Sequence, residues 1–154
     1  MFRKKEGVII DLSSMTPYQT KSNKLTGTNL KEVKKNAMAL YKEIASKTKR
    51  RPYVRSAYFK EGRKKQKIFF DYFWQHLRQK NQRDQMRRLK YFKAAIEVIK
   101  YSRNHPKSED NPHKAGEILH RFAGLTKDKE IFFVQIKEDK KTSKKYLMSC
   151  FPLE

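Results

Sequence analysis

The sequence predicts an α+β fold, in which N-terminal helices are followed by a C-terminal antiparallel β-sheet meander packed on a helix. Two observations lead to this prediction. Apolar residues recur at helical spacing up to about residue 101, and three strand-like stretches then follow one another between residues 117 and 151. The chain has 154 residues, which suits one domain. We expect that domain to span residues 29–154, after a loosely ordered basic arm over residues 1–28 with a short strand at Val8–Ile10.

The first helix is expected between Asn29 and about Lys47. Thr28 or Asn29 can cap its N-terminus, and Pro52 follows its end. One face carries apolar residues at helical spacing: Leu30, Val33, Ala37, Leu40 and Ile44.

The middle of the chain predicts two short strands and two further helices. The strand-like pieces are Val54–Phe59 and Ile68–Phe70, separated by the basic turn EGRKKQK. Asp71 is expected to cap the next helix, which has Phe73, Trp74 and Leu77 on its apolar face. A continuous helix from Arg83 to Tyr101 is then predicted by one apolar stripe: Leu89, Phe92, Ile96 and Ile99.

Three strands are expected after the polar loop HPKSEDNPHKAGE, namely Glu117–Leu125, Glu130–Glu138 and Lys144–Phe151. The segments between them are short enough for hairpins. In the middle strand Phe132, Val134 and Ile136 alternate with Phe133, Gln135 and Lys137, so one set faces the core.

The charge of the chain points to a polyanionic partner. It carries 38 Lys+Arg against 16 Asp+Glu, a formal net charge of +22. Residues 47–93 hold 17 Lys/Arg and three acids, so 17 − 3 = +14 of this charge lies there, interleaved with aromatic residues. Basic side chains neutralise phosphates and aromatic rings stack on bases, so RNA is the expected partner, with DNA also bound electrostatically. We expect the phosphate contacts from Arg50, Arg51, Arg55, Lys64, Lys65, Arg83, Arg87 and Arg88.

Other partners and compartments are less consistent with the sequence. No apolar run approaches the roughly 18–20 residues of a membrane span, so no membrane partner is expected. The single cysteine, Cys150, fits a reducing compartment, and a cytoplasmic protein is predicted. Four histidines and one cysteine match no zinc-finger spacing, and no glycine-rich phosphate loop is present, so we expect no cofactor and no metal. The segment from Glu138 to Lys141 leaves a metal-dependent nuclease as a weaker alternative.

Metal-independent RNA cleavage requires few groups, because the ribose 2′-hydroxyl is itself the nucleophile. It needs a base, an acid, and cationic or hydroxyl donors for the phosphate, and histidine suits the acid and base roles. Candidate catalytic residues of these types are His76, His120, Arg121, Lys137 and Ser149. Each has a structural alternative: His120, for example, alternates with Ile118 and Phe122 and can equally be a buried, hydrogen-bonded histidine.

The segment from Ile68 to Pro152 resembles the barnase–EndoU–colicin–RelE-like nuclease superfamily, especially its phage-associated toxin-domain branch. The stretches that support this resemblance are WQHL, AAIEVIK, HPKS, ILHRFAGLTKDKEIFFVQIKE and KKYLMSCFP, in this order. The resemblance implies helices before a four-stranded antiparallel sheet, metal-independent ribonuclease activity and a toxin-like role. It also implies an acidic antitoxin or immunity protein as a partner.

The resemblance matches each candidate catalytic residue to a position in the motifs of the family. His76 matches the histidine after the aromatic helix, His120 and Arg121 match the first strand, and Lys137 matches the basic residue that ends the middle strand. Ser149 stands where the family usually has threonine, and no carboxylate clearly corresponds to the general base of some members.

Two functions therefore stay open. The first is a toxin-like ribonuclease that leaves a 2′,3′-cyclic phosphate, and the resemblance and the His/Lys/Ser set favour it. The second is a non-catalytic RNA- or DNA-binding protein, such as a ribosome-associated or phage accessory factor, because charge indicates association and not chemistry.

Overall fold

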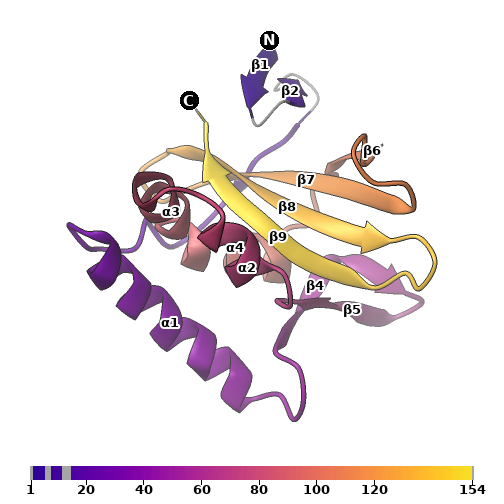
Figure 1. Ribbon diagram of the computed structural model, residues 1–154. Coiled ribbons are helices and arrows are strands. Elements are labelled where there is room, and N and C mark those ends of the chain that lie inside the picture. Colours follow the sequence, from indigo (N-terminus) through magenta and orange to yellow (C-terminus); the bar gives the residue numbers. More distant parts are fainter. Residues whose placement is uncertain (1, 6–7, 12–14, 154) are drawn as a thin grey trace.

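The computed structural model describes residues 2–5, 8–11 and 15–153 of the chain, with side chains from residue 15 onward (Figure 1). Four helices lie in this part of the chain: α1 (Leu30–Ser46), α2 (Phe73–Arg78), α3 (Gln82–Leu89) and α4 (Phe92–Tyr101). The strands are β1 (Phe2–Lys5), β2 (Val8–Asp11), β3 (Tyr18–Gln19), β4 (Tyr53–Glu61), β5 (Lys64–Phe69), β6 (Lys107–Asp110), β7 (Glu117–Leu125), β8 (Ile131–Asp139) and β9 (Lys145–Pro152). None of these helices is long and apolar enough to cross a membrane.

The principal sheet is mixed and has the strand order β3-β7-β8-β9-β5-β4. Strand β6 pairs with β7 in addition to this order. Strands β7, β8 and β9 form the predicted antiparallel meander. The α+β class is therefore confirmed, but the prediction of a purely antiparallel sheet that follows all the helices is wrong. The β4–β5 hairpin precedes three of the helices and joins the sheet through a parallel pairing of β5 with β9, and β3 pairs with β7 in the same way.

The sheet has two faces of different character. On the core face, Phe132, Val134 and Ile136 of β8 are fully buried in a cluster that also contains the apolar side of α4. We call the opposite side the outer face. It carries Gln135 and Lys137, because successive side chains of a strand alternate. Helix α4 lies on the core side of the meander, α2 and α3 lie against β9, and β4–β5 continues the sheet beyond β9 (Figure 1).

The helices differ from the prediction at two points. The expected helix from Arg83 to Tyr101 is interrupted at Lys90–Tyr91, which separates α3 from α4. Asp71 does not cap α2, whose N-cap position is Tyr72 without a side-chain cap, and instead forms an ion pair with Arg51 at 2.6 Å. The cap of α1 agrees with the prediction, since the Asn29 side chain accepts a hydrogen bond from the Glu32 N–H at 3.0 Å.

The segment expected as a loosely ordered arm contributes to the fold over its described part. The predicted strand Val8–Ile10 lies within β2, which pairs with β1. Met15 is buried in a small second cluster, and β3 pairs with the end of β7. Glu97 of α4 then accepts hydrogen bonds from the backbone N–H groups of Lys21 and Ser22, at 2.9 and 3.1 Å. Residues 15–28 therefore contact both the β7 side of the sheet and α4.

Candidate functional site

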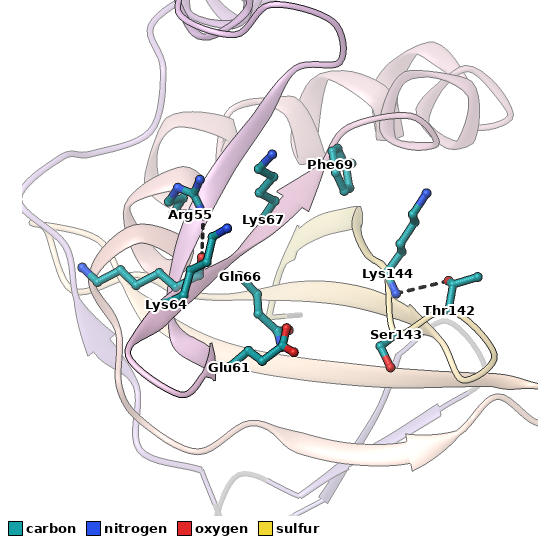
Figure 2. A pocket seen from close by; sticks show the side chains of 10 residues that line it. Arg55, Glu61, Lys64, Gln66, Lys67, Phe69, Thr142, Ser143 and Lys144 are labelled. Carbon is teal, nitrogen blue, oxygen red and sulfur yellow. Dashed lines mark hydrogen bonds between the residues drawn. The ribbon is translucent and has the colours of Figure 1, made fainter.

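Two adjoining hollows lie along the β4–β5 hairpin and together form what we call the basic groove. The first, of about 230 Å³, lies between this hairpin and the β8–β9 turn, and Figure 2 shows Arg55 and Lys67 on one side of it and Lys144 on the other. The second, of about 460 Å³, lies between the hairpin and the segment that follows α1. The two hollows share Lys67 and Phe69 in their linings, so they adjoin at these residues.

Cationic side chains dominate the lining of the basic groove, which includes one acid, Glu61. Of its cations, Lys47 lies 3.7 Å from Glu43 and Arg51 lies 2.6 Å from Asp71. The other cations have no ion pair with a carboxylate of residues 15–153. Nine Lys/Arg residues line the groove: Lys47, Lys49, Arg50, Arg51, Arg55, Lys64, Lys65, Lys67 and Lys144.

Aromatic rings hold some of these cations in place. The Arg51 guanidinium lies 4.3 Å from the centre of the Phe69 ring, and the Lys67 ammonium lies 4.6 Å from the centre of the Tyr53 ring. Tyr53 and Phe69 pack edge to face across the hairpin at 6.1 Å. A cation over an aromatic face is attracted by the ring electrons, so these rings orient positive charge along the groove.

The basic groove collects five of the predicted nucleic-acid-binding residues, namely Arg50, Arg51, Arg55, Lys64 and Lys65. The other three lie on α3. Arg83 and Arg87 line a separate hollow of about 280 Å³. Arg88 is only 4% exposed, forms an ion pair with Asp84 and donates to the Ser149 hydroxyl at 2.8 Å. Arg88 is therefore buried among partners within the protein and, unlike the residues of the basic groove, is not placed on an open surface.

A further cavity of about 350 Å³ lies on the outer face of the sheet, and we call it the Arg121 cavity. It is covered by the end of α2 and the following turn on one side and by the loop between β6 and β7 on the other. Its lining is His76, Lys80, Asn111, Pro112, His113, Leu119, Arg121, Gln135 and Met148.

Arg121 is a buried cation without a full set of partners. Its side chain is 4% exposed, and one terminal nitrogen donates to the Gln135 side-chain oxygen at 2.5 Å. Its Nε is buried and has no hydrogen-bond partner among the described residues. No carboxylate of residues 15–153 lies within ion-pair distance of it, and burial lowers the pKa of Arg121 below its ordinary value.

His76 and Lys137 lie close to this cavity. Burial, with the neighbouring charges of Lys80 and Lys137, lowers the pKa of His76, so its imidazole is neutral at pH 7. The Lys137 ammonium lies 3.1 Å from the Glu117 carboxylate and 3.9 Å from the centre of the Tyr72 ring. Two of the predicted catalytic residues, His76 and Arg121, thus line one cavity, and Lys137 is adjacent to them.

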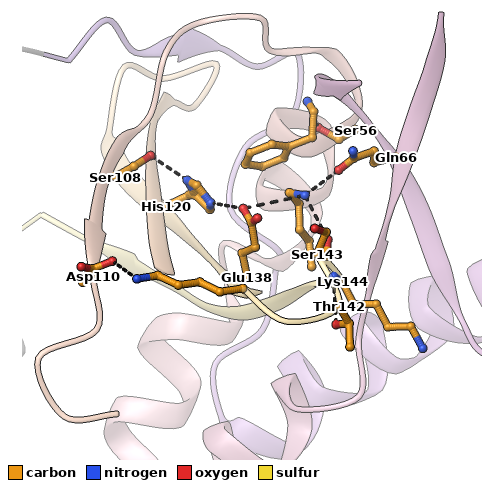
Figure 3. A network of polar contacts seen from close by, with 12 residues as sticks. Ser56, Gln66, Ser108, Asp110, His120, Glu138, Thr142, Ser143 and Lys144 are labelled. Atoms are coloured by element: carbon orange, nitrogen blue, oxygen red, sulfur yellow. Dashed lines mark hydrogen bonds and ion pairs between the residues drawn. The ribbon is translucent and has the colours of Figure 1, made fainter. Parts of the chain in front are cut away.

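His120 lies on the opposite face of the sheet. Figure 3 shows its imidazole between Ser108 and Glu138, with Nδ1 2.6 Å from the Ser108 hydroxyl and Nε2 2.7 Å from Glu138 Oε1. The same carboxylate lies 3.7 Å from Lys145. Burial lowers the pKa of His120, although the hydrogen bond and charge of Glu138 act to raise it. His120 is 8% exposed, so it has the environment of a structural histidine.

The predicted set of five is therefore divided by the sheet. His120 and Arg121 are neighbours in β7, and their side chains alternate between the core face and the outer face. Ser149 is on the outer face but is 3% exposed and accepts the hydrogen bond from Arg88. His76 and His120 consequently cannot act together as acid and base on one phosphate.

Among the polar side chains that line the Arg121 cavity, sequence reasoning missed four, namely Lys80, Asn111, His113 and Gln135. Gln135 could have been found, because it is aligned with Arg121 and Ser149 across the three strands. His113 belongs to the polar loop between β6 and β7, and the sequence does not indicate that this loop lies beside the end of α2. In the part of the chain that the structure describes, no group of three or more His, Cys, Asp or Glu side chains is arranged to hold a metal ion.

Comparisons of the chain with protein-family models, with curated proteins and with solved structures give no match. The resemblance to the nuclease superfamily therefore stays a prediction. The functional argument below depends on the geometry and charge of the basic groove and the Arg121 cavity.

Proposed function

We propose that this protein binds nucleic acid by its sugar-phosphate backbone in the basic groove. The observation that carries this proposal is the gathering of nine Lys/Arg side chains along two adjoining hollows, most of them without a carboxylate partner among the described residues. Such a gathering is electrostatically costly unless anions neutralise it. A polymer with a phosphate at regular intervals meets several of these cations at once and releases its own counterions.

The test is a matched pair of double variants. Lys64→Ala/Lys65→Ala removes two exposed cations of the groove, and Lys31→Ala/Lys35→Ala removes two exposed lysines of α1 that line neither hollow. We expect the groove variant to bind an oligonucleotide about 10- to 100-fold more weakly at about 0.1 M salt. Its slope of log K against log salt should be smaller in magnitude by about two, since each lost phosphate contact removes about 0.9. Equal losses in both variants would show that binding follows net charge and not the groove.

A second candidate function is metal-independent ribonuclease activity, because the Arg121 cavity brings two histidines together with two cations. His76 comes from α2 and His113 from the opposite loop, and Lys80 and Arg121 lie in the same lining. Neutral His76 can take the proton of the ribose 2′-hydroxyl while the 2′-oxygen forms a bond to phosphorus. The bond from phosphorus to the 5′-oxygen breaks, His113 as the general acid gives that oxygen a proton, and Arg121 stabilises the additional negative charge.

Incubation of the full chain with single-stranded RNA, in the presence and absence of EDTA, tests this second function. We expect cleavage in both, with products that end in 2′,3′-cyclic phosphate, and no cleavage of DNA. His76→Ala and His113→Ala should each lower the rate by about 10²–10⁴-fold. His105→Ala, an exposed histidine outside the cavity lining, should retain the rate. Intact RNA under every condition would leave binding alone as the function.

A further inference from the structure

The Arg121 cavity has the features of a binding site for one phosphate group. Its buried guanidinium is paired with an amide and not with a carboxylate of the described chain, and its Nε lacks a hydrogen-bond partner there. The negative charge of Glu109 acts on Arg121 from beyond ion-pair distance, so the buried guanidinium lacks a direct counter-ion, which destabilises the folded state. An anion in the cavity would supply the missing charge and acceptor, and guanidinium groups match phosphate oxygens with two parallel hydrogen bonds. Lys80 and His76 in the same lining add donors.

Aromatic contacts connect this cavity with the basic groove. Phe69 of the groove lies 6.0 Å from Tyr146, ring centre to ring centre, and Tyr146 lies 4.8 Å from Tyr72. Tyr72 directly precedes α2, and its carbonyl accepts the backbone N–H of His76 at 3.0 Å. Tyr72, whose side chain is 41% exposed, is therefore the exposed ring that lies between the groove and the cavity in this series of contacts.

We infer that the ligand of this combined surface is a single-stranded nucleic acid, with its backbone in the basic groove, a base on Tyr72 and one phosphate in the Arg121 cavity. This inference rests on the proposed function for its groove part. An exposed ring accepts any unpaired base by stacking, whereas the bases of a duplex are already stacked on each other. A phosphate in a single strand can turn into a cavity, and the continuous backbone of a duplex keeps its phosphates on the surface.

The first experiment tests the aromatic step with two exposed tyrosines. Tyr72→Ala should weaken binding of a single-stranded oligonucleotide by about 5- to 150-fold and leave duplex binding almost unchanged. Tyr101→Ala removes a tyrosine that is 56% exposed at the end of α4 and should have little effect on either ligand. Tyr72→Phe should restore single-strand binding, because it keeps the ring. Equal affinity of the intact protein for single strands and duplexes, with no effect of Tyr72→Ala, would overturn the single-strand assignment.

The second experiment tests the cavity by itself, with inorganic phosphate as the probe. In a titration of the intact protein at constant ionic strength, we expect the ring resonances of His76 to shift and saturate. Those of His120, on the core face, should stay in place. Arg121→Gln should abolish the shift. Lys80→Ala leaves the buried Arg121 in place, so we expect this variant to keep its fold. It should bind phosphate more weakly than the unaltered protein. A His76 resonance that phosphate does not move in the unaltered protein would overturn the phosphate site.

The two proposals can fail separately. Lys64→Ala/Lys65→Ala should reduce oligonucleotide binding while the phosphate-dependent shift of His76 persists. If oligonucleotides do not bind but inorganic phosphate still saturates His76, the proposed function is wrong and the cavity accepts small phosphate compounds. If oligonucleotides bind by the groove and phosphate does not shift His76, the cavity inference is wrong and the proposed function stands.

Discussion

At the scale of single residues, the two neighbours His120 and Arg121 show what sequence reasoning can and cannot reach. Alternation along a strand places them on opposite faces. Ile118 and Phe122, two residues before and after His120, indicate that His120 lies on the apolar face. Which face carries the cavity is decided by the distant residues His76 and His113, and no local pattern contains that information. Candidate residue types were therefore predictable, whereas their grouping into one site was not.

The burial of His120 predicts a loss of stability in mild acid. Its pKa is lowered in the folded protein from the ordinary value of about 6.5, so the unfolded chain binds more protons as the pH falls. The stabilising contribution is complete above about pH 6.5 and is lost as the pH falls through the folded-state pKa. We expect urea unfolding to show a smaller decrease in the free energy of unfolding from about pH 7.5 to 5.5 for His120→Gln than for the unaltered protein.

His113→Gln, which removes an exposed histidine, is the control and should keep the unaltered pH dependence. If all three proteins lose the same free energy of unfolding over this pH range, His120 is not the group responsible.

At the scale of secondary-structure elements, local patterns predicted the meander well. The strand predicted at Glu117–Leu125 coincides with β7, because alternating side chains give a strong signal over nine residues. The break between α3 and α4 escaped prediction, since Leu89 and Phe92 continue one apolar stripe across it and both are fully buried. The parallel pairing of Ile68 with Lys145 could not be predicted from the sequence, because the local pattern of a strand does not specify which distant strand it pairs with.

The core face of β8 gives a direct test of the register. Val134 is fully buried in the apolar cluster between its strand neighbours and the helices, so Val134→Asp places a carboxylate among apolar side chains. We expect this variant to lose the cooperative unfolding transition seen by circular dichroism. Lys127→Asp introduces the same side chain in the exposed turn between β7 and β8 and should unfold like the unaltered protein. A cooperative transition in Val134→Asp would show that this side chain does not face the core.

At the scale of the whole molecule, the dominant property is a net charge of +22 on 154 residues. Like charges repel each other in the compact state more than in the expanded chain, so this charge opposes folding. The larger apolar cluster, on the core face of the sheet, counteracts this repulsion and includes most of α4. Folding and ligand binding are consequently coupled, because an anion that occupies the groove relieves the repulsion.

We expect the melting temperature to rise with ionic strength and to rise further with a single-stranded oligonucleotide at constant salt. Salt screens the repulsion between surface charges, with a Debye length of about 10 Å at 0.1 M, and a ligand that binds only the folded state stabilises it by mass action. Differential scanning fluorimetry with added sodium chloride measures the first effect. A melting temperature that stays constant from about 0.05 to 0.5 M salt would show that charge repulsion does not limit the stability of the fold.

The parallel pairing of β5 with β9 also has a consequence during translation. Ile68 leaves the ribosome before its partner Lys145 has been made, and the interval is 145 − 68 = 77 residues. At roughly 5–20 residues per second this takes on the order of 4–15 s. Throughout that time the β4–β5 hairpin has an unpaired edge and no β9 to cover it. The basic segment of β4 and β5 therefore stays for seconds without its β9 partner next to the ribosome, whose surface is rich in RNA.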